Sequence, residues 1–272
     1  MYASNFEYDG KLLSDFGFII CEFNGSGGLE TKETGYNITF NKVPRHGGRI
    51  NGLAGTKYDE CVRCSFSICK NPNLYDDAEI TNEEYRNVVR WLNRHEFHKF
   101  RMLHEDGETM VSPCFFNASF NIEKTYVADK LCGLELTAET DAPYGYGAPY
   151  DRTFTFTGGG GETAKIIDTS DDAGYLRPDL TITCGDNGTF TLSNPLCDSE
   201  MEIKNCVIGE VINIYGSTQI ITSSVPSHKV YNDFNYEFLK IGNTYGSRMN
   251  TITCPKQCTL RIKFTPTIKD IP

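Results

Sequence analysis

The stretch of sequence that decides the fold is Cys61-Val62-Arg63-Cys64-Ser65-Phe66-Ser67-Ile68-Cys69-Lys70. Val62, Cys64, Phe66 and Ile68 fall at every second position, and successive side chains of a β-strand point to opposite faces. We therefore predict a strand with one apolar and one polar face. The same alternation recurs in five further segments, Asn37–Phe40, Phe116–Ile122, Leu134–Thr137, Phe154–Phe156 and Leu180–Cys184.

Turn residues separate these segments at short intervals, which is the pattern of β-sandwiches. Gly185-Asp186-Asn187-Gly188 contains Asn-Gly, the signature of a type I′ hairpin turn, so a hairpin is predicted there. The predicted fold class is therefore mainly all-β.

One helix is predicted within this β-rich chain. Thr81-Asn82-Glu83-Glu84 is a capping box, in which the threonine and Glu84 satisfy each other's free backbone N–H groups. Tyr85, Val88, Val89 and Leu92 follow at helical spacing, so one face of the helix is expected to pack on a sheet. Trp91 lies near the edge of that apolar stripe and is expected to help anchor the helix.

The length of 272 residues favours two domains, since single cores stop growing near about 250 to 300 residues. The alternating strand pattern gives way to a segment rich in glycine and proline between 141 and 149, and the glycine run 158–161 follows shortly after. Glycine-rich segments bury little apolar area and form flexible loops. We place the boundary at 145, with domains 1–145 and 146–272.

Charge and cysteine usage restrict the function. The net charge is −10, which argues against a general nucleic-acid binder because phosphate binding needs clustered Lys and Arg. No apolar run approaches the roughly 20 residues of a membrane span, and the N-terminus has no signal-peptide pattern. We therefore expect synthesis in a cytosol, no membrane insertion, and reduced, mostly buried thiols for the eleven cysteines.

Two cysteine pairs are candidates for metal ligands. Cys61 and Cys64 fall on opposite faces of a predicted strand and cannot share a metal ion. Cys254-Pro255-Lys256-Gln257-Cys258 contains a turn, and its spacing suits a metal or a disulfide. A complete site needs about four ligands, and no second pair has an obvious spacing. No metal site is predicted.

The remaining candidate motifs for metal binding, nucleotide binding and catalysis lack the sequence context that each of these sites requires. His95, His98 and His104 lie where the helical stripe has ended, which excludes the two-histidine zinc helix and indicates solvated histidines at a strand edge. The glycine run lacks the Gly-Lys-Ser/Thr ending of a phosphate loop, and no nucleophile elbow occurs. We predict no catalytic residue, no cofactor and no enzyme activity.

Many short motifs, in their order along the chain, resemble the distal tail proteins (Dit family) of long-tailed, non-contractile phages. The N-terminal motifs span the opening Phe6–Ile20, the Gly47-Gly48 loop, the strand 58–68, the helix end Val88–Leu92, Phe100–Leu103 with the acidic turn 104–108, and the domain end 141–144. The C-terminal motifs are 178–182, 209–212 and 238–243. One departure is Ile212-Asn213, where the family pattern has Ile-Asp, so any role of that acid does not transfer.

The resemblance implies a specific architecture and role. It implies two successive β-sandwich domains: a ring-forming N-terminal one with a packed helix, and an outer, galectin-like C-terminal one. The ring, with six members, would join the tail tube to baseplate, tail-tip or adhesion proteins at the virion tail tip, after assembly in the bacterial host cytoplasm. DNA would pass through its lumen without specific binding, and an acidic inner wall would suit this passage because like charges repel.

Contact residues are predicted in one loop. Pro44-Arg45-His46-Gly47-Gly48-Arg49 concentrates positive charge in an acidic chain, so Arg45 and Arg49 are candidates for contacts with acidic residues of a neighbouring subunit or tail partner. A solvated loop is the alternative, since exposed charge pairs contribute only about 0 to 1 kcal/mol.

A second function remains open from sequence. Galectin-like sandwiches often bind saccharides, so the alternative is a carbohydrate-binding module that contributes to host-surface attachment. Tyr215, Tyr231 and Tyr236 are the candidate aromatic residues for such a site. Fold does not imply function, and strand aromatics commonly fill cores, which favours the structural role.

Overall fold

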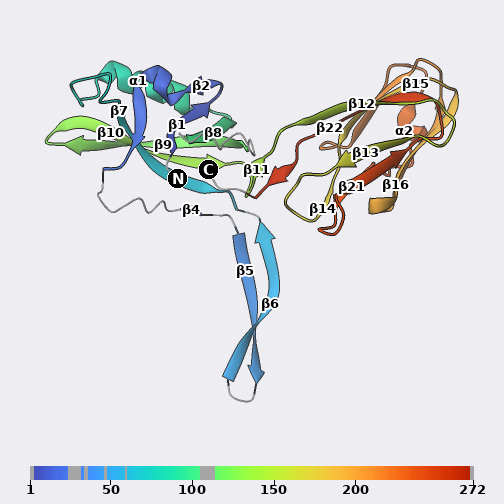
Figure 1. The fold of residues 1–272 in the computed structure, drawn as a ribbon, viewed down its shortest axis with the longest axis horizontal. Helices are drawn as coiled ribbons and strands as arrows, with labels where there is room; N and C mark the ends of the chain where they lie inside the picture. The colour runs from blue at the N-terminus through green and yellow to red at the C-terminus, as the bar shows by residue number, and fades with distance from the viewer. Residues whose placement is uncertain are drawn as a thin grey trace. The chain divides into compact units, whose positions relative to one another are not determined.

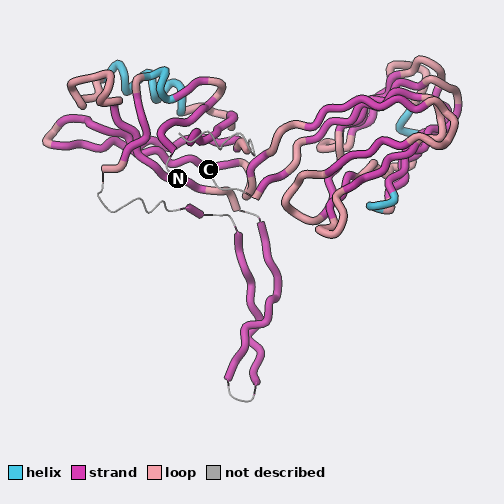
Figure 2. The backbone as a smooth tube through the Cα atoms, viewed as in Figure 1, coloured by secondary structure: helices cyan, strands magenta, loops and turns pink. Residues whose placement is uncertain are grey.

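The computed structural model describes residues 3–23, 32–33, 36–45, 48–58, 60–104 and 114–269. Strands dominate this part of the chain and only short segments are helical (Figure 2), so the predicted, mainly all-β fold is confirmed. The chain divides into two compact units, residues 1–146 with 269–272 and residues 147–268. Among the described residues, no helix is long and apolar enough to cross a membrane.

The first unit is built on one eight-stranded antiparallel sheet in the order β2-β1-β8-β9-β10-β7-β3, with β4 paired to β7. The sheet is curled, because β1 and β3 contact each other although they are not neighbours in the pairing order. Its strands are β1 (Ala3–Tyr8), β2 (Lys11–Leu12), β3 (Phe18–Cys21), β4 (Lys32–Glu33), β7 (Arg63–Lys70), β8 (His98–His104), β9 (Phe116–Val127) and β10 (Lys130–Thr140), with the 3-10 helix η1 (Leu13–Phe16) and the short strand β11 (Gly145–Tyr146).

Aromatic side chains fill the core of this unit. Phe6 of β1 stacks on Trp91 of helix α1 (Asn82–Leu92), with ring centroids 5.4 Å apart. Trp91 also stacks on Phe16 at 4.4 Å, and its indole N–H donates to the backbone oxygen of Tyr8 at 3.0 Å. Because the buried indole satisfies its one polar group, it fixes the helix on β1 at little cost. The expected anchoring role of Trp91 is therefore observed.

The capping box at the start of α1 forms as predicted. The Glu84 N–H donates to Thr81 Oγ1 at 3.3 Å, and the Thr81 N–H donates to Glu84 Oε2 at 2.7 Å. Lys70 of β7, whose side chain is largely buried, pairs with the same carboxylate oxygen at 2.9 Å. The cap therefore also ties the helix to the sheet.

A hairpin of two long strands belongs to the same unit. β5 (Tyr36–Arg45) and β6 (Gly48–Tyr58) pair only with each other among the described strands and form a two-stranded ribbon (Figure 1). The register shifts between Thr39 and Phe40, which marks a β-bulge. Bulges increase strand twist, and the ribbon is visibly twisted.

The second unit is a sandwich of two antiparallel sheets. The five-stranded sheet has the order β12-β22-β15-β18-β19, and the four-stranded sheet has the order β13-β21-β16-β17. Inward-facing residues of both sheets form one core, which includes Leu180, Ile182, Ile203 and Leu260. The elements are β12 (Tyr150–Phe156), β13 (Thr163–Ile167), β14 (Gly174–Leu176), β15 (Asp179–Cys184), β16 (Gly188–Asn194), η3 (Pro195–Cys197), β17 (Ser199–Cys206), β18 (Val211–Tyr215), β19 (Ile220–Ser223), α2 (Val230–Asp233), β20 (Ile241–Asn243), β21 (Met249–Thr253), β22 (Cys258–Phe264) and β23 (Thr267–Ile268).

The hairpin predicted at Asn187-Gly188 is wrong. β15 ends at Cys184 and pairs with β18 and β22, whereas β16 begins at Gly188 and pairs with β17 and β21. The turn therefore carries the chain from one sheet of the sandwich to the other. Local turn chemistry favours a reversal of direction but does not determine which strands pair afterwards.

The contribution of Glu84 to stability is expected to depend on pH. Partial burial raises the pKa of its carboxyl, but hydrogen bonds from Thr81 and the ion pair with Lys70 outweigh this and hold the pKa below its ordinary value. A carboxyl with a lowered folded pKa stabilises the fold above the unfolded pKa, and this stability is lost as the pH falls through the folded pKa. Glu84→Gln should therefore reduce the free energy of unfolding at pH 7 by about 1 kcal/mol, a typical cap energy.

The measurement is urea unfolding followed by circular dichroism, at pH 7 and at steps down to pH 3. The gap between wild type and Glu84→Gln should narrow as the pH falls, because the wild-type carboxyl then becomes neutral too. Glu83→Gln, an exposed neighbour in the same turn, is the control. A gap that stays constant with pH contradicts the role of the charged cap.

Candidate interaction sites

The hairpin of the first unit exposes apolar side chains on both strands. Phe40 and Leu53 face each other across the ribbon, and they are 51% and 67% exposed. Ile38 and Val43 of β5 are also exposed. Isolated large apolar residues on a surface are normal, but four on one narrow ribbon favour a contact surface for another protein.

The two predicted contact residues lie at the end of this hairpin. In the backbone register Arg45 pairs with Gly48, and Arg49 pairs with Pro44. Their side chains, and residues 46–47, lie outside the described part of the chain. The structure thus brings both backbones to the tip of one ribbon, and a contact through these arginines stays a prediction.

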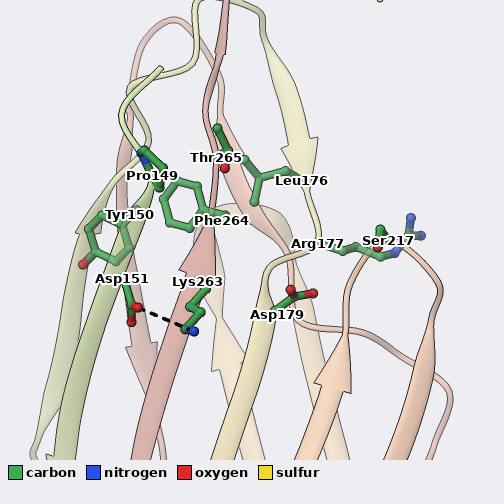
Figure 3. A pocket seen from close by; sticks show the side chains of 10 residues that line it. All are labelled: Pro149, Tyr150, Asp151, Leu176, Arg177, Asp179, Ser217, Lys263, Phe264 and Thr265. Carbon is green, nitrogen blue, oxygen red and sulfur yellow. Dashed lines mark ion pairs between the residues drawn. The ribbon is translucent and has the colours of Figure 1, made fainter. Parts of the chain in front are cut away.

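The second unit contains a pocket of about 450 Å³. Its walls come from the start of β12, the end of β22 and the segment between β14 and β15 (Figure 3). The lining side chains are Pro149, Tyr150, Asp151, Leu176, Arg177, Asp179, Ser217, Lys263, Phe264 and Thr265.

One wall of the pocket combines an aromatic pair with a charged cluster. The rings of Tyr150 and Phe264 stack with centroids 4.7 Å apart. Next to them Asp151 accepts two hydrogen bonds of 2.7 Å from Arg261 and lies 3.6 Å from Lys263. The Arg261 guanidinium, with help from Lys263, lowers the pKa of Asp151, so this carboxylate stays charged at neutral pH.

The opposite wall is shaped by a close backbone approach. Asp179 Oδ1 accepts from the N–H of Gly216 at 2.7 Å. A Cβ added at Gly216 would lie 2.0 Å from the backbone oxygen of Arg177, so only glycine fits. The Arg177 guanidinium lies over the ring of Tyr175 at 5.4 Å, while its buried Nε has no hydrogen-bond partner among the described residues. Arg177 therefore has an unused donor beside the pocket.

The tyrosines proposed from sequence for a saccharide site lie elsewhere. Tyr215, Tyr231 and Tyr236 are exposed, but none of them lines the pocket. Tyr231 and Tyr236 are close together, since the Tyr236 hydroxyl donates to the Tyr231 backbone oxygen at 2.7 Å. The pocket could not be predicted from the sequence, because its lining residues come from segments far apart in the chain.

The histidines after α1 do not form a ligand set in the described residues. His95 is exposed, and His98 Nδ1 lies 3.3 Å from Asp9 Oδ1, packed beside Tyr8. The side chain of His104 and all of Glu105 lie outside the described part of the chain.

Two pairs of buried thiols lie in the second unit, and only one of them has a spacing that is recognisable in the sequence. The turn 254–258 brings the Sγ atoms of its two cysteines to 3.6 Å. A second pair, Cys184 and Cys206, lies in the same core with Glu210, and the ligand atoms of these three residues are all within 4.8 Å of one another. Sequence spacing could not reveal this pair, because its members belong to strands in different sheets.

Comparison with known proteins gives the family. Residues 1–142 match a family model described as phage tail protein N-terminal domain, and residues 144–264 match one described as phage tail C-terminal domain. The chain belongs to this phage tail protein family. It is therefore a structural component of a phage tail, and the virion tail is its location.

The fold is similar to that of a solved distal tail protein. One matching structure is described as the crystal structure of the Dit (gp 19.1) protein of phage SPP1, "a Paradigm of Hub Adsorption Apparatus in Gram-positive Infecting Phages". The TM-score is 0.62 at 9% identity, over 97% of this chain and 99% of that one. A search of curated proteins found no match. The resemblance to distal tail proteins stated from sequence is confirmed, with the fold shared over nearly the whole chain.

Substitution of Gly216 is expected to damage the pocket wall of this tail protein. The Gly216→Ala methyl group would overlap the backbone of Arg177 and Pro178, and backbone atoms cannot move aside as a flexible side chain does. Overpacking of this kind typically costs about 1 to 3 kcal/mol. Thermal unfolding should show a lower midpoint for Gly216→Ala. Gly161→Ala, where a Cβ meets nothing within 4 Å, is the control, and equal midpoints for both variants contradict the argument.

Proposed function

We propose that this protein is the distal tail hub of its phage, a ring of six copies that joins the tail tube to the baseplate, tail-tip or adhesion proteins. In this proposal residues 1–145 form the ring and residues 146–272 form an outer, galectin-like domain. DNA passes through the lumen without specific binding, and the protein has no enzymatic activity. The observation that carries the proposal is the fold shared with the SPP1 Dit protein over both units.

The β5–β6 hairpin supports self-assembly. A two-stranded ribbon is marginally stable on its own in water, and this one exposes Phe40 and Leu53 instead of burying them. A closed ring needs a heterologous interface, in which one surface of each copy meets a different surface of the next. The hairpin supplies one such surface, through apolar side chains and through strand edges that a neighbour's strand would complete.

The ring predicts a specific effect of hairpin substitutions. Phe40→Ser with Leu53→Ser should weaken assembly by about tenfold or more, because the loss of two apolar contact residues exceeds the roughly 1.4 kcal/mol that a tenfold change requires. Native mass spectrometry over a range of concentrations measures the distribution of species. Ile208→Ser with Tyr245→Ser removes equally exposed apolar groups from the second unit and should leave the ring intact.

Two further experiments test the role of the arginines and the existence of the ring. Arg45→Glu with Arg49→Glu tests the charge at the hairpin tip, and unchanged assembly removes the arginines from the interface. A wild-type chain that stays monomeric at every concentration, and that also forms no ring when mixed with its tail tube protein, contradicts the ring itself.

The pocket of the second unit favours saccharide attachment as a second candidate function. It combines stacked aromatic rings with the charged side chains of Asp151, Arg177 and Lys263 in one concave site, which is the composition of small-ligand sites. Binding of a host-surface saccharide there would add adhesion to the structural role.

A glycan array with the full chain tests this second candidate. Arg177→Ala should reduce any binding by about tenfold, as expected when one hydrogen bond to a charged group is lost. Tyr231→Ala with Tyr236→Ala should leave it unchanged. The reverse pattern assigns binding to the tyrosine surface, and an array with no binding rejects the saccharide function while leaving the ring untouched.

A further inference from the structure

One end of the sandwich in the second unit contains four buried thiols. Cys184 ends β15 and Cys258 begins β22 in the five-stranded sheet, whereas Cys206 ends β17 and Cys254 follows β21 in the four-stranded sheet. All four are between 1% and 3% exposed. Two thiols from each sheet thus meet inside the same core.

The spacing of these groups suits a tetrahedral metal ion. Zinc binds cysteine sulfur at about 2.3 Å, which separates two tetrahedral sulfur ligands by about 3.8 Å. The Sγ atoms of Cys254 and Cys258 are 3.6 Å apart, and the ligand atoms of Cys184, Cys206 and Glu210 are within 4.8 Å of one another. Cys184 and Cys258 are also direct partners in the strand register, so the two sets are adjacent.

Glu210 distinguishes this cluster from ordinary core filling. A buried cysteine behaves as a small apolar residue and needs no charged neighbour. Glu210, however, has a carboxylate with no exposed surface beside two of these thiols. A buried carboxylate is costly unless it is paired or bound to a metal. Glu210 is paired with His228 and Ser223 through Oε1, so a ligand role is indicated only by its position beside the thiols and by its other oxygen, Oε2.

The contacts of Glu210 match those of a metal-ligating carboxylate. His228 Nδ1 lies 2.6 Å from Oε1, and the Ser223 hydroxyl donates to the same oxygen. Among the described residues, Oε2 accepts a hydrogen bond from the Val207 N–H alone, at 3.0 Å, which leaves it a lone pair for a ligand. Ligating carboxylates are commonly held by such outer hydrogen bonds, which orient them toward the metal.

We propose that this end of the second unit binds one thiophilic divalent cation of the zinc class. Cys184, Cys206 and Glu210 are three of its ligands. The fourth would come from Cys254 or Cys258 after a side-chain rotation toward the ion, since neither thiol lies within 4.8 Å of all three other ligand atoms. All of these groups are buried, so the site is closed and structural, with no position for a substrate. The ion would clamp the two sheets together at the end where β15, β17, β21 and β22 meet. This proposal does not depend on the ring or on saccharide binding.

Metal content of the full chain is the first test. Protein purified with a reducing agent and without chelators or metal-affinity resin should contain about one zinc ion per chain by plasma mass spectrometry, the content of a single closed site. Replacement by Co²⁺ should give the near-ultraviolet sulfur-to-cobalt absorption of thiolate ligands. Zinc near zero, together with no rise of the unfolding midpoint on addition of Zn²⁺, overturns the proposal.

Cysteine variants identify the ligands. Cys184→Ser with Cys206→Ser should lose the ion, and Cys254→Ser with Cys258→Ser should weaken binding at least tenfold. Cys61→Ser with Cys132→Ser removes two half-buried thiols of the first unit and should keep a full equivalent. Retention of one equivalent by folded Cys184→Ser/Cys206→Ser contradicts the assignment.

Two measurements on the wild-type chain test the metal site even if a cysteine variant fails to fold. The Co²⁺ spectrum of the wild-type chain reports thiolate ligation directly, and an absorption without sulfur bands overturns the site. Thiol titration of the denatured wild-type chain, purified without reductant, should find all eleven thiols once the metal is removed. A deficit of four that appears only in the second unit indicates two disulfides in place of the metal, which also overturns it.

Discussion

Alternate burial along antiparallel strands is the constraint on which the rest of this structure depends. In the second unit Ile182 faces Leu260 and Leu180 faces Ile262 across the β15–β22 ladder, and all four side chains are buried. A slip of one residue would turn each of them toward solvent, so burial fixes the register. The same register brings Cys184 opposite Cys258 at the end of the ladder. The position of the thiol cluster is thus a consequence of how the core is packed.

The first unit meets the same constraint with a curled sheet and one helix. Phe6, Phe100 and Phe120 from neighbouring strands pack around one another, and Trp91 of α1 closes the group by stacking on Phe6. Aromatic contacts of this kind add to the free energy of burial beyond the area removed from water. No described side chain of the hairpin β5–β6 belongs to this core, and Ile38, Phe40, Val43 and Leu53 are exposed. The described interactions that hold the ribbon together are those of its own strand ladder.

The sequence predicts features that depend on residues close together in the chain, and it does not predict features that depend on residues far apart. The alternation of Val62, Cys64 and Ile68 and the capping box at Thr81 are local patterns, and both are present as expected. The turn at Asn187 was misread because strand pairing is not local. Tyr150 and Phe264 form one pocket wall, although more than a hundred residues lie between them in the sequence. Neither the pocket nor the second thiol pair had a spacing that could be recognised.

The hairpin β5–β6 differs from the main sheet of the first unit in the length of its unpaired strand edges. In the first unit the described edge strands of the main sheet are short, β2 with 2 residues and β3 with 4, and short edges resist pairing with other chains. β5 and β6 have 10 and 11 residues, and each has an outer edge without a partner among the described strands. Natural proteins protect long edges of this kind by covering or pairing them. Among the described strands, the main sheet of the first unit thus ends in short edges whereas the hairpin has two long unpaired ones, an arrangement that favours completion of the hairpin by a neighbouring protein in the assembled tail.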